Sequence, residues 1–113
     1  MLFFKSESRK KAEMYEKLAE LLESKISTMD SKILSVKNYV DDVNATLKKE
    51  EDSAKGYLIT TLEDSNERWH TNGKMIIDSM EIAKQSLAGQ KNMVSALAGM
   101  WQKIADAEEA ANG

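Results

Sequence analysis

The sequence predicts an all-α protein, an antiparallel hairpin of two long helices in a single domain. The chain has 113 residues with no proline and five glycines, so the strongest helix breakers are nearly absent. Its 42% hydrophobic and 31% charged residues are typical of a folded domain. Apolar residues also recur at alternating spacings of three and four, which is the pattern of helices that pack along one narrow seam, as in coiled coils.

The first helix is expected over about residues 7–50. Apolar residues occupy every position of a three-four frame that begins at Ala12 and is held for five heptads. Such a long uninterrupted pattern predicts one buried seam along the helix. The seam positions are Ala12, Tyr15, Ala19, Leu22, Ile26, Met29, Ile33, Val36, Val40, Val43 and Leu47.

The second helix is expected over about residues 61–109. Its three-four frame is mostly apolar, and its exceptions are Asn66, Gly73 and Gln90. A heptad frame of this length predicts a seam that faces the first helix. The frame positions are Ile59, Leu62, Asn66, Trp69, Gly73, Ile76, Met80, Ala83, Leu87, Gln90, Val94, Leu97, Trp101 and Ile104.

The two frames are out of phase, which predicts a turn at about residues 51–60. Gly56 would end the first helix, and the run Thr61 to Asp64 has the spacing of a capping box for the second. In the alternative, one helix continues through this stretch and the turn falls at Asn72-Gly73, a strong turn dipeptide. We expect instead that Gly73 leaves a small gap in a continuing helix, where a neighbouring backbone comes close.

Further apolar residues lie beside the two seams at the ends of the chain. Because the helices run antiparallel, the start of the first lies beside the end of the second, and the two apolar faces meet. We therefore expect this end to pack against another helical protein or a second copy of the chain, forming a four-helix bundle. The predicted partner-binding residues are Met14, Leu18, Leu21, Met93, Leu97, Met100 and Trp101.

Residue types argue against an enzyme and against a resident cofactor. One histidine and no cysteine leave few ways to build a nucleophile with its base, and no Gly-rich phosphate loop is present. Glu67 and His70 have the Glu-x-x-His spacing of di-iron bundles. The facing seam of the first helix has no carboxylate to complete such a site. A metal-binding bundle that uses Glu67 and His70 is therefore a subordinate alternative.

Charge and hydropathy restrict the partners and the location. The net charge is −3, and no basic patch of the size that nucleic-acid binding requires is present. Met1 to Phe4 is too short for the apolar core of a signal peptide, and no later stretch is long and apolar enough to insert into a membrane. We expect a cytoplasmic protein that, if exported, uses a route without a Sec signal.

Trp69 and Gly73 lie near the middle of a helical chain that lacks cysteine and proline. In these features the chain resembles the Trp-x-Gly (ESAT-like) helical hairpins of type VII secretion and the small partner proteins of LXG toxins. Those hairpins have one residue between tryptophan and glycine, whereas this chain has three. The resemblance implies a non-catalytic, chaperone-like protein that binds the helical N-terminal region of a secreted effector and escorts it to the secretion machine.

Overall fold

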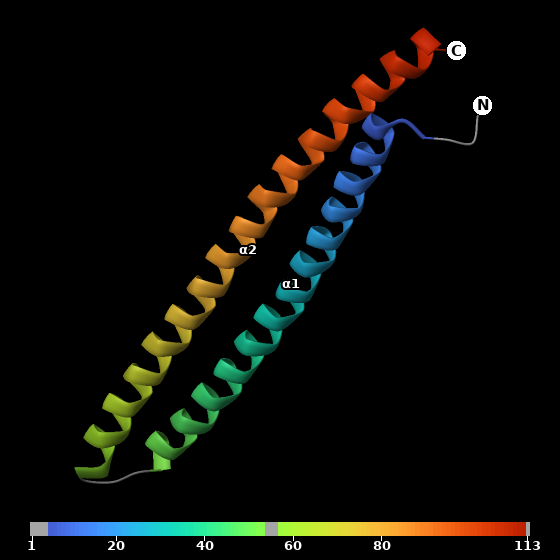
Figure 1. The fold of residues 1–113 in the computed structure, drawn as a ribbon. Helices are drawn as coiled ribbons and strands as arrows, with labels where there is room; N and C mark the ends of the chain where they lie inside the picture. Colours follow the sequence, from blue (N-terminus) through green and yellow to red (C-terminus); the bar gives the residue numbers. More distant parts are fainter. Residues whose placement is uncertain (1–4, 54–56, 113) are drawn as a thin grey trace. The chain divides into compact units, whose positions relative to one another are not determined.

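The protein is a hairpin of two long helices, as predicted. A computed structural model describes residues 5–53 and 57–112 of the chain. Helix α1 spans Glu7–Ser53 and helix α2 spans Tyr57–Asn112, and the described residues contain no strand. The two helices run in opposite directions (Figure 1). The all-α hairpin is therefore confirmed, while its assembly into a bundle stays a prediction.

The described chain divides into two compact units, and each contains a piece of both helices. The terminal unit combines α1 up to Ser27 with α2 from Gln85 onward. The central unit comprises Thr28–Lys84. In each unit the α1 segment packs against an antiparallel α2 segment, so each has its own portion of the seam.

The connection between the helices is shorter than predicted. Glu51 to Ser53 still belong to α1, and Tyr57 to Thr60 already belong to α2. The capping box at Thr61 is therefore wrong, because these residues lie inside α2. Gly56, the predicted end of the first helix, lies outside the described residues. Without proline, nothing in this charged stretch stops the helices earlier.

The alternative turn at Asn72-Gly73 is wrong, since α2 continues through both residues. Gly73 is buried, and a Cβ placed on it would lie 2.9 Å from the Val40 Cγ1 atom. A small gap was expected here for a neighbouring backbone. The Val40 side chain fills it instead, and this close packing offsets the cost of about 1 kcal/mol for glycine inside a helix.

The seam of α1 lies where the heptad frame places it. Every predicted position from Ala12 to Leu47 is buried or half-buried. The seam also extends by one position at each end, to the buried Ser8 and the half-buried Glu51. A strict heptad therefore describes this helix over its whole described length.

The seam of α2 leaves the predicted frame after Gly73. Beyond Gly73, every second seam position lies one residue later than the heptad frame predicts. The shift arises because Asn66, Trp69, Gly73 and Ile77 are spaced three, four and four apart. This eleven-residue step has 3.67 residues per turn and takes up the mismatch between a heptad and a straight helix. The positions that replace Ile76, Ala83, Gln90, Leu97 and Ile104 are Ile77, Lys84, Lys91, Ala98 and Ala105.

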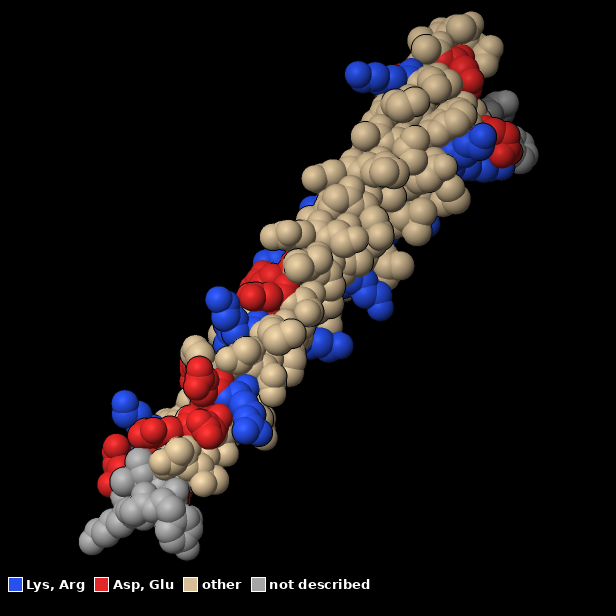
Figure 2. All heavy atoms as spheres, turned by 90° about the vertical axis from the view of Figure 1, so that its left-hand side faces the viewer, with Lys and Arg blue, Asp and Glu red and all other residues tan. Residues whose placement is uncertain are grey.

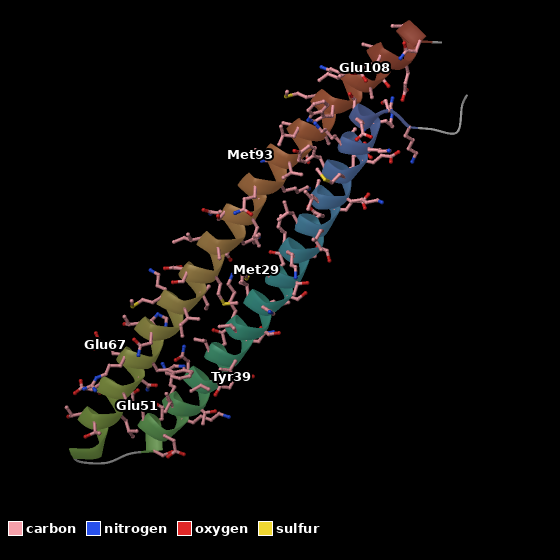
Figure 3. The ribbon with its side chains drawn as sticks, in the orientation of Figure 1. Met29, Tyr39, Glu51, Glu67, Met93 and Glu108 are labelled. Carbon is pink, nitrogen blue, oxygen red and sulfur yellow. The ribbon has the colours of Figure 1, made fainter. Side chains whose placement is uncertain are left out.

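Trp69 is held in the central unit by contacts from α1. Its indole nitrogen donates to the Val40 carbonyl oxygen at 3.4 Å, and its ring meets that of Tyr39 edge to face with centroids 6.0 Å apart. Tyr39 lies on α1 between Met29 and Glu51 (Figure 3). Trp69, Val40 and Gly73 thus form one packed cluster across the seam, which we call the Trp69 cluster.

Substituting alanine at two helical glycines tests this packing. Gly89→Ala should raise the free energy of unfolding by up to about 1 kcal/mol, because alanine favours helix and its Cβ would meet nothing within 4 Å. Gly73→Ala should lose this gain and destabilise, because its Cβ would press on Val40. Urea unfolding followed by circular dichroism measures both. Equal gains at the two positions would contradict the packing of Gly73 on Val40.

Candidate functional site

One flank of the terminal unit is lined by polar contacts between the helices. Arg9 donates to Asp106 at 2.5 Å and to Glu109 at 2.8 Å, and the hydroxyl of Ser8 donates to Glu108 at 3.0 Å. Two further pairs, Gln102 with Glu16 and Lys91 with Glu23, lie along the same flank. These contacts define the polar flank of the hairpin.

The polar flank follows a heptad spacing on α1 and is also present in the central unit. There Asp30 pairs with Lys84 at 2.7 Å, and Lys37 pairs with Glu81 at 3.5 Å. The amide of Asn66 donates to Glu51 at 2.6 Å. The α1 members are spaced by seven residues or a multiple of seven: Arg9, Glu16, Glu23, Asp30, Lys37 and Glu51.

Two of these ion pairs shift the pKa of at least one of their two partners. The hydrogen bond from Arg9 lowers the pKa of the Glu109 carboxyl, and the hydrogen bond to Asp30 raises the pKa of Lys84. The carboxylates that face these cations are largely in contact with solvent, so each pair adds little to stability on its own. Together they favour one alignment of the helices.

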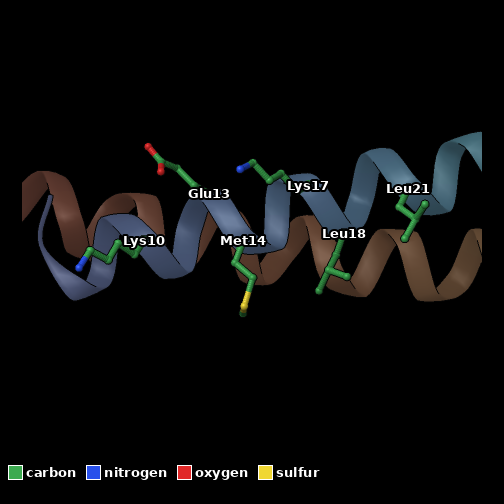
Figure 4. A pocket seen from close by; sticks show the side chains of 6 residues that line it. All are labelled: Lys10, Glu13, Met14, Lys17, Leu18 and Leu21. Atoms are coloured by element: carbon green, nitrogen blue, oxygen red, sulfur yellow. The ribbon is translucent and has the colours of Figure 1, made fainter.

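The other flank of the terminal unit is apolar. On α1, Met14, Leu18 and Leu21 are 48%, 40% and 54% exposed. They line a shallow surface hollow with Lys10, Glu13 and Lys17 (Figure 4). Their heptad positions lie across the seam from those of Arg9, Glu16 and Glu23. The apolar side chains therefore point away from the polar flank.

Helix α2 extends this apolar surface. Met93 and Met100 are 68% and 56% exposed, and Leu97 is half-buried between them. Ile104 was predicted in the seam but is 38% exposed and lies in line with Leu97, one heptad further on. In α2 these positions also lie across the seam from the polar flank. We call the resulting surface the apolar face: Met14, Leu18, Leu21, Met93, Leu97, Met100 and Ile104.

Trp101 borders the apolar face from inside the seam. It is half-buried, and the Lys11 ammonium lies 4.3 Å from the centre of its ring, a cation–π contact. Along α2, Lys91 is the only charged residue between Lys84 and Lys103. A long uncharged surface over α2 is accordingly visible in the space-filling view (Figure 2).

Among the residues of the central unit whose burial is described, the exposed apolar side chains do not form a comparable face. Leu34 lies next to the polar flank, whereas Met75 and Ile82 lie on the outer side of α2. Tyr39 and Ile76 lie on the apolar side, and the Tyr39 ring already contacts Trp69. Exposed apolar side chains therefore cluster on one side in the terminal unit.

The predicted metal ligands lie on the surface of the central unit. Both Glu67 and His70 are exposed, and a shallow hollow on α2 is lined by Glu67 together with Asp64, Arg68, Thr71 and Asn72. Within residues 5–53 and 57–112, no three His, Cys, Asp or Glu side chains are grouped so that they could hold a metal ion. Nothing in this arrangement favours the metal-binding alternative over an interaction role.

Neither described helix contains a stretch long and apolar enough to cross a membrane. No protein-family model, curated protein sequence or solved structure matches the chain.

Acid should weaken the contact between Arg9 and Glu109. The pKa of Glu109 is lower in the folded protein than in the unfolded chain, where it is about 4.3. The ionised carboxylate therefore stabilises the fold above this unfolded-state pKa, and the stabilisation is lost as the pH falls through the folded-state pKa. Glu109→Gln should thus lower the melting temperature at neutral pH, and the difference from the unsubstituted protein should shrink between about pH 5 and pH 3. Thermal unfolding by circular dichroism checks this.

The matched control is Glu20→Gln on the same helical pair. Glu20 is exposed and forms no ion pair with another described residue. Its substitution should leave the melting temperature nearly unchanged at every pH. A difference for Glu109→Gln that does not depend on pH would show that the contact with Arg9 is not electrostatic.

Proposed function

We propose that the protein is a non-catalytic helical interaction protein, which binds a helical partner on the apolar face of its terminal unit. The observation that carries the proposal is the exposure of four large side chains to 48% or more on one side of the same unit: Met14, Leu21, Met93 and Met100. An amphipathic helix laid on such a face buries its own apolar stripe at the same time.

The apolar face is large enough to matter energetically. Full burial of a leucine or methionine side chain is worth about 1.5–3 kcal/mol, so covering one that is half-exposed contributes roughly 1 kcal/mol. Summed over the face, this gives several kcal/mol from one partner, before the partner's own apolar side chains are counted. Methionine also adapts its flexible thioether chain to irregular surfaces.

The cellular role that we propose is that of a targeting or chaperone-like partner of a secreted effector in a type VII-like system. Support comes from the helical-hairpin architecture and from the tryptophan and glycine near the middle of the chain. In this role the effector's helical N-terminal region would cover the apolar face. The protein would be made in the cytoplasm and would contribute binding rather than chemistry.

A homo-oligomeric adaptor unrelated to secretion is the second candidate. It is favoured by the same apolar face, because a second copy could bury it and complete a four-helix bundle. The two candidates differ in what covers Met93 and Met100, which a cross-linking experiment identifies directly.

A photoreactive amino acid at position 93 or 100 in the native host tests the proposal. Cross-links from these positions should join the protein to one polypeptide, identified by mass spectrometry as another helical protein rather than a second copy. The matched control is position 20, which is exposed on the opposite side of the same unit. Equal cross-linking from positions 20 and 93, or a stable monomer that yields no cross-linked partner, would refute the proposal.

Two substitutions should separate binding from folding. Val40→Asp buries an unpaired carboxylate at a position that is 8% exposed and should lower the free energy of unfolding by about 3 kcal/mol or more. Met100→Asp, at a position 56% exposed, should change that free energy by less than about 1 kcal/mol but weaken association at least tenfold. Urea unfolding and sedimentation velocity provide the two measurements. The reverse ranking would contradict the assignment of seam and face.

A further inference from the structure

The two sides of the terminal unit differ in how their charged residues are paired. The apolar face is bordered by lysines, and the carboxylates of Glu16, Glu23 and Glu109 lie on the polar flank, where each meets a partner from the other helix. The bordering lysines are Lys10, Lys11, Lys17, Lys25 and Lys103. The two sides of this unit therefore offer different electrostatic environments to a partner.

Among the bordering lysines, Lys10 pairs with a carboxylate near the apolar face. Glu13 lines the hollow beside Met14 but pairs with Lys5 at 2.8 Å. Glu7, at the start of α1, lies 3.3 Å from Lys10. Lys17 and Lys25 form no ion pair with another residue in the described part of the chain and are exposed. Two exposed ammonium groups beside the apolar face thus form no ion pair within the described residues.

We propose that the partner is an amphipathic helix with carboxylates beside its apolar stripe. This rests on the proposed function and adds the chemistry of the partner. Lysine stems can lie along the edge of an apolar contact while their ammonium groups stay at its rim. There they attract acidic side chains, increase the association rate and select partners by charge.

A second copy of the chain offers less complementary charge, because the carboxylates near its apolar face, Glu7 and Glu13, already pair with Lys10 and Lys5. In a two-fold symmetric dimer both copies present the same patch. Such a dimer would place the lysine border of α1 against another lysine border or against the largely uncharged surface of α2. Neither arrangement places unpaired carboxylates opposite Lys17 and Lys25.

An anionic lipid surface fits less well than an acidic helix. Lys17 has Glu13 and Glu20 close by on the same helix, and a flat anionic surface would meet them as well. The net charge of the chain is also −3. A helix, by contrast, can place its few carboxylates opposite individual lysines while its apolar stripe covers Met14, Leu18 and Leu21.

Two synthetic helical peptides with one apolar stripe test the proposal. Leucines form the stripe in both, and the positions beside it carry glutamate in one peptide and lysine in the other. Binding to the full-length protein is measured by fluorescence anisotropy of the labelled peptide. The glutamate peptide should bind at least tenfold more tightly at low salt, and its advantage should shrink in about 0.5 M salt, where screening is strong.

A charge-reversed variant of the protein provides a second test of the same proposal. The double substitution Lys17→Glu and Lys25→Glu should reverse the preference between the peptides. A matched control, Lys48→Glu with Lys49→Glu, makes the same change in net charge at exposed lysines of the central unit and should leave the preference intact. Melting temperatures of both variants establish that they are folded.

The outcomes separate this inference from the proposed function. Equal affinity for both peptides, lost in Met100→Asp, would overturn the acidic partner while leaving the apolar face as a docking site. Failure of both peptides to bind would overturn the inference, and the cross-linking experiment at positions 93 and 100 would then decide the function separately. Exclusive binding to phosphatidylserine vesicles, or a stable dimer that excludes both peptides, would also overturn the inference.

Discussion

Everything in this hairpin depends on the single seam that two helices share. A helix pair without a third layer can cover only one side of each helix. Among the described residues, the buried apolar side chains are Ala12, Ile33, Val40, Ala98 and Ala105, and no large side chain is fully buried. Three of these five are alanines, which bring the helices close but bury little area. The larger seam residues, Trp69 and Trp101 included, remain half-buried.

Because the apolar seam is narrow, it does not by itself fix how far one helix is shifted along the other. A seam of similar aliphatic residues could slide by one heptad at modest cost. The polar flank opposes such a slide, since its α1 members recur every seven residues but their α2 partners differ in charge. Moving α2 by a heptad would place Lys84 or Lys91 opposite different α1 residues. Polar groups at seam positions therefore lower the stability somewhat but favour a single register between the two helices.

How much could be predicted from the sequence differs between the helices. The whole α1 seam follows its heptads, because no residue interrupts them. In α2 the prediction held up to Gly73. Beyond it, alternate seam positions lie one residue later than predicted, because an eleven-residue step replaced a heptad, whereas Met80, Leu87, Val94 and Trp101 are half-buried as predicted. The sequence hides this step, since Ile76 and Ile77 are both isoleucine and either could face α1. Lys84 and Lys91 would also have seemed unsuited to a seam before their acidic partners were placed.

Contacts between the helices were the least predictable feature. Pairing Glu23 with Lys91, or Arg9 with Glu109, requires the registers of both helices at once, and a one-residue error in α2 changes each pair. The exposure of five apolar residues could be predicted from the sequence alone. They are Met14, Leu18, Leu21, Met93 and Met100. They lie outside either possible seam, so the shift does not change their exposure. Ile104 moved from seam to surface for the same reason that Ala105 became buried.

The structure places the two tryptophans in different settings. Trp69 is engaged within the chain through Val40, Tyr39 and the space left by Gly73. Trp69 and Gly73 therefore have a structural role in the packing of the central unit. Trp101 lies in the terminal unit beside exposed methionines, with Lys11 on its ring. A partner bound as we propose would lie beside Trp101 and would not need to contact Trp69. The proposed binding of a partner and the packing of the Trp69 cluster thus use different residues, so substitutions on the apolar face should leave this cluster intact.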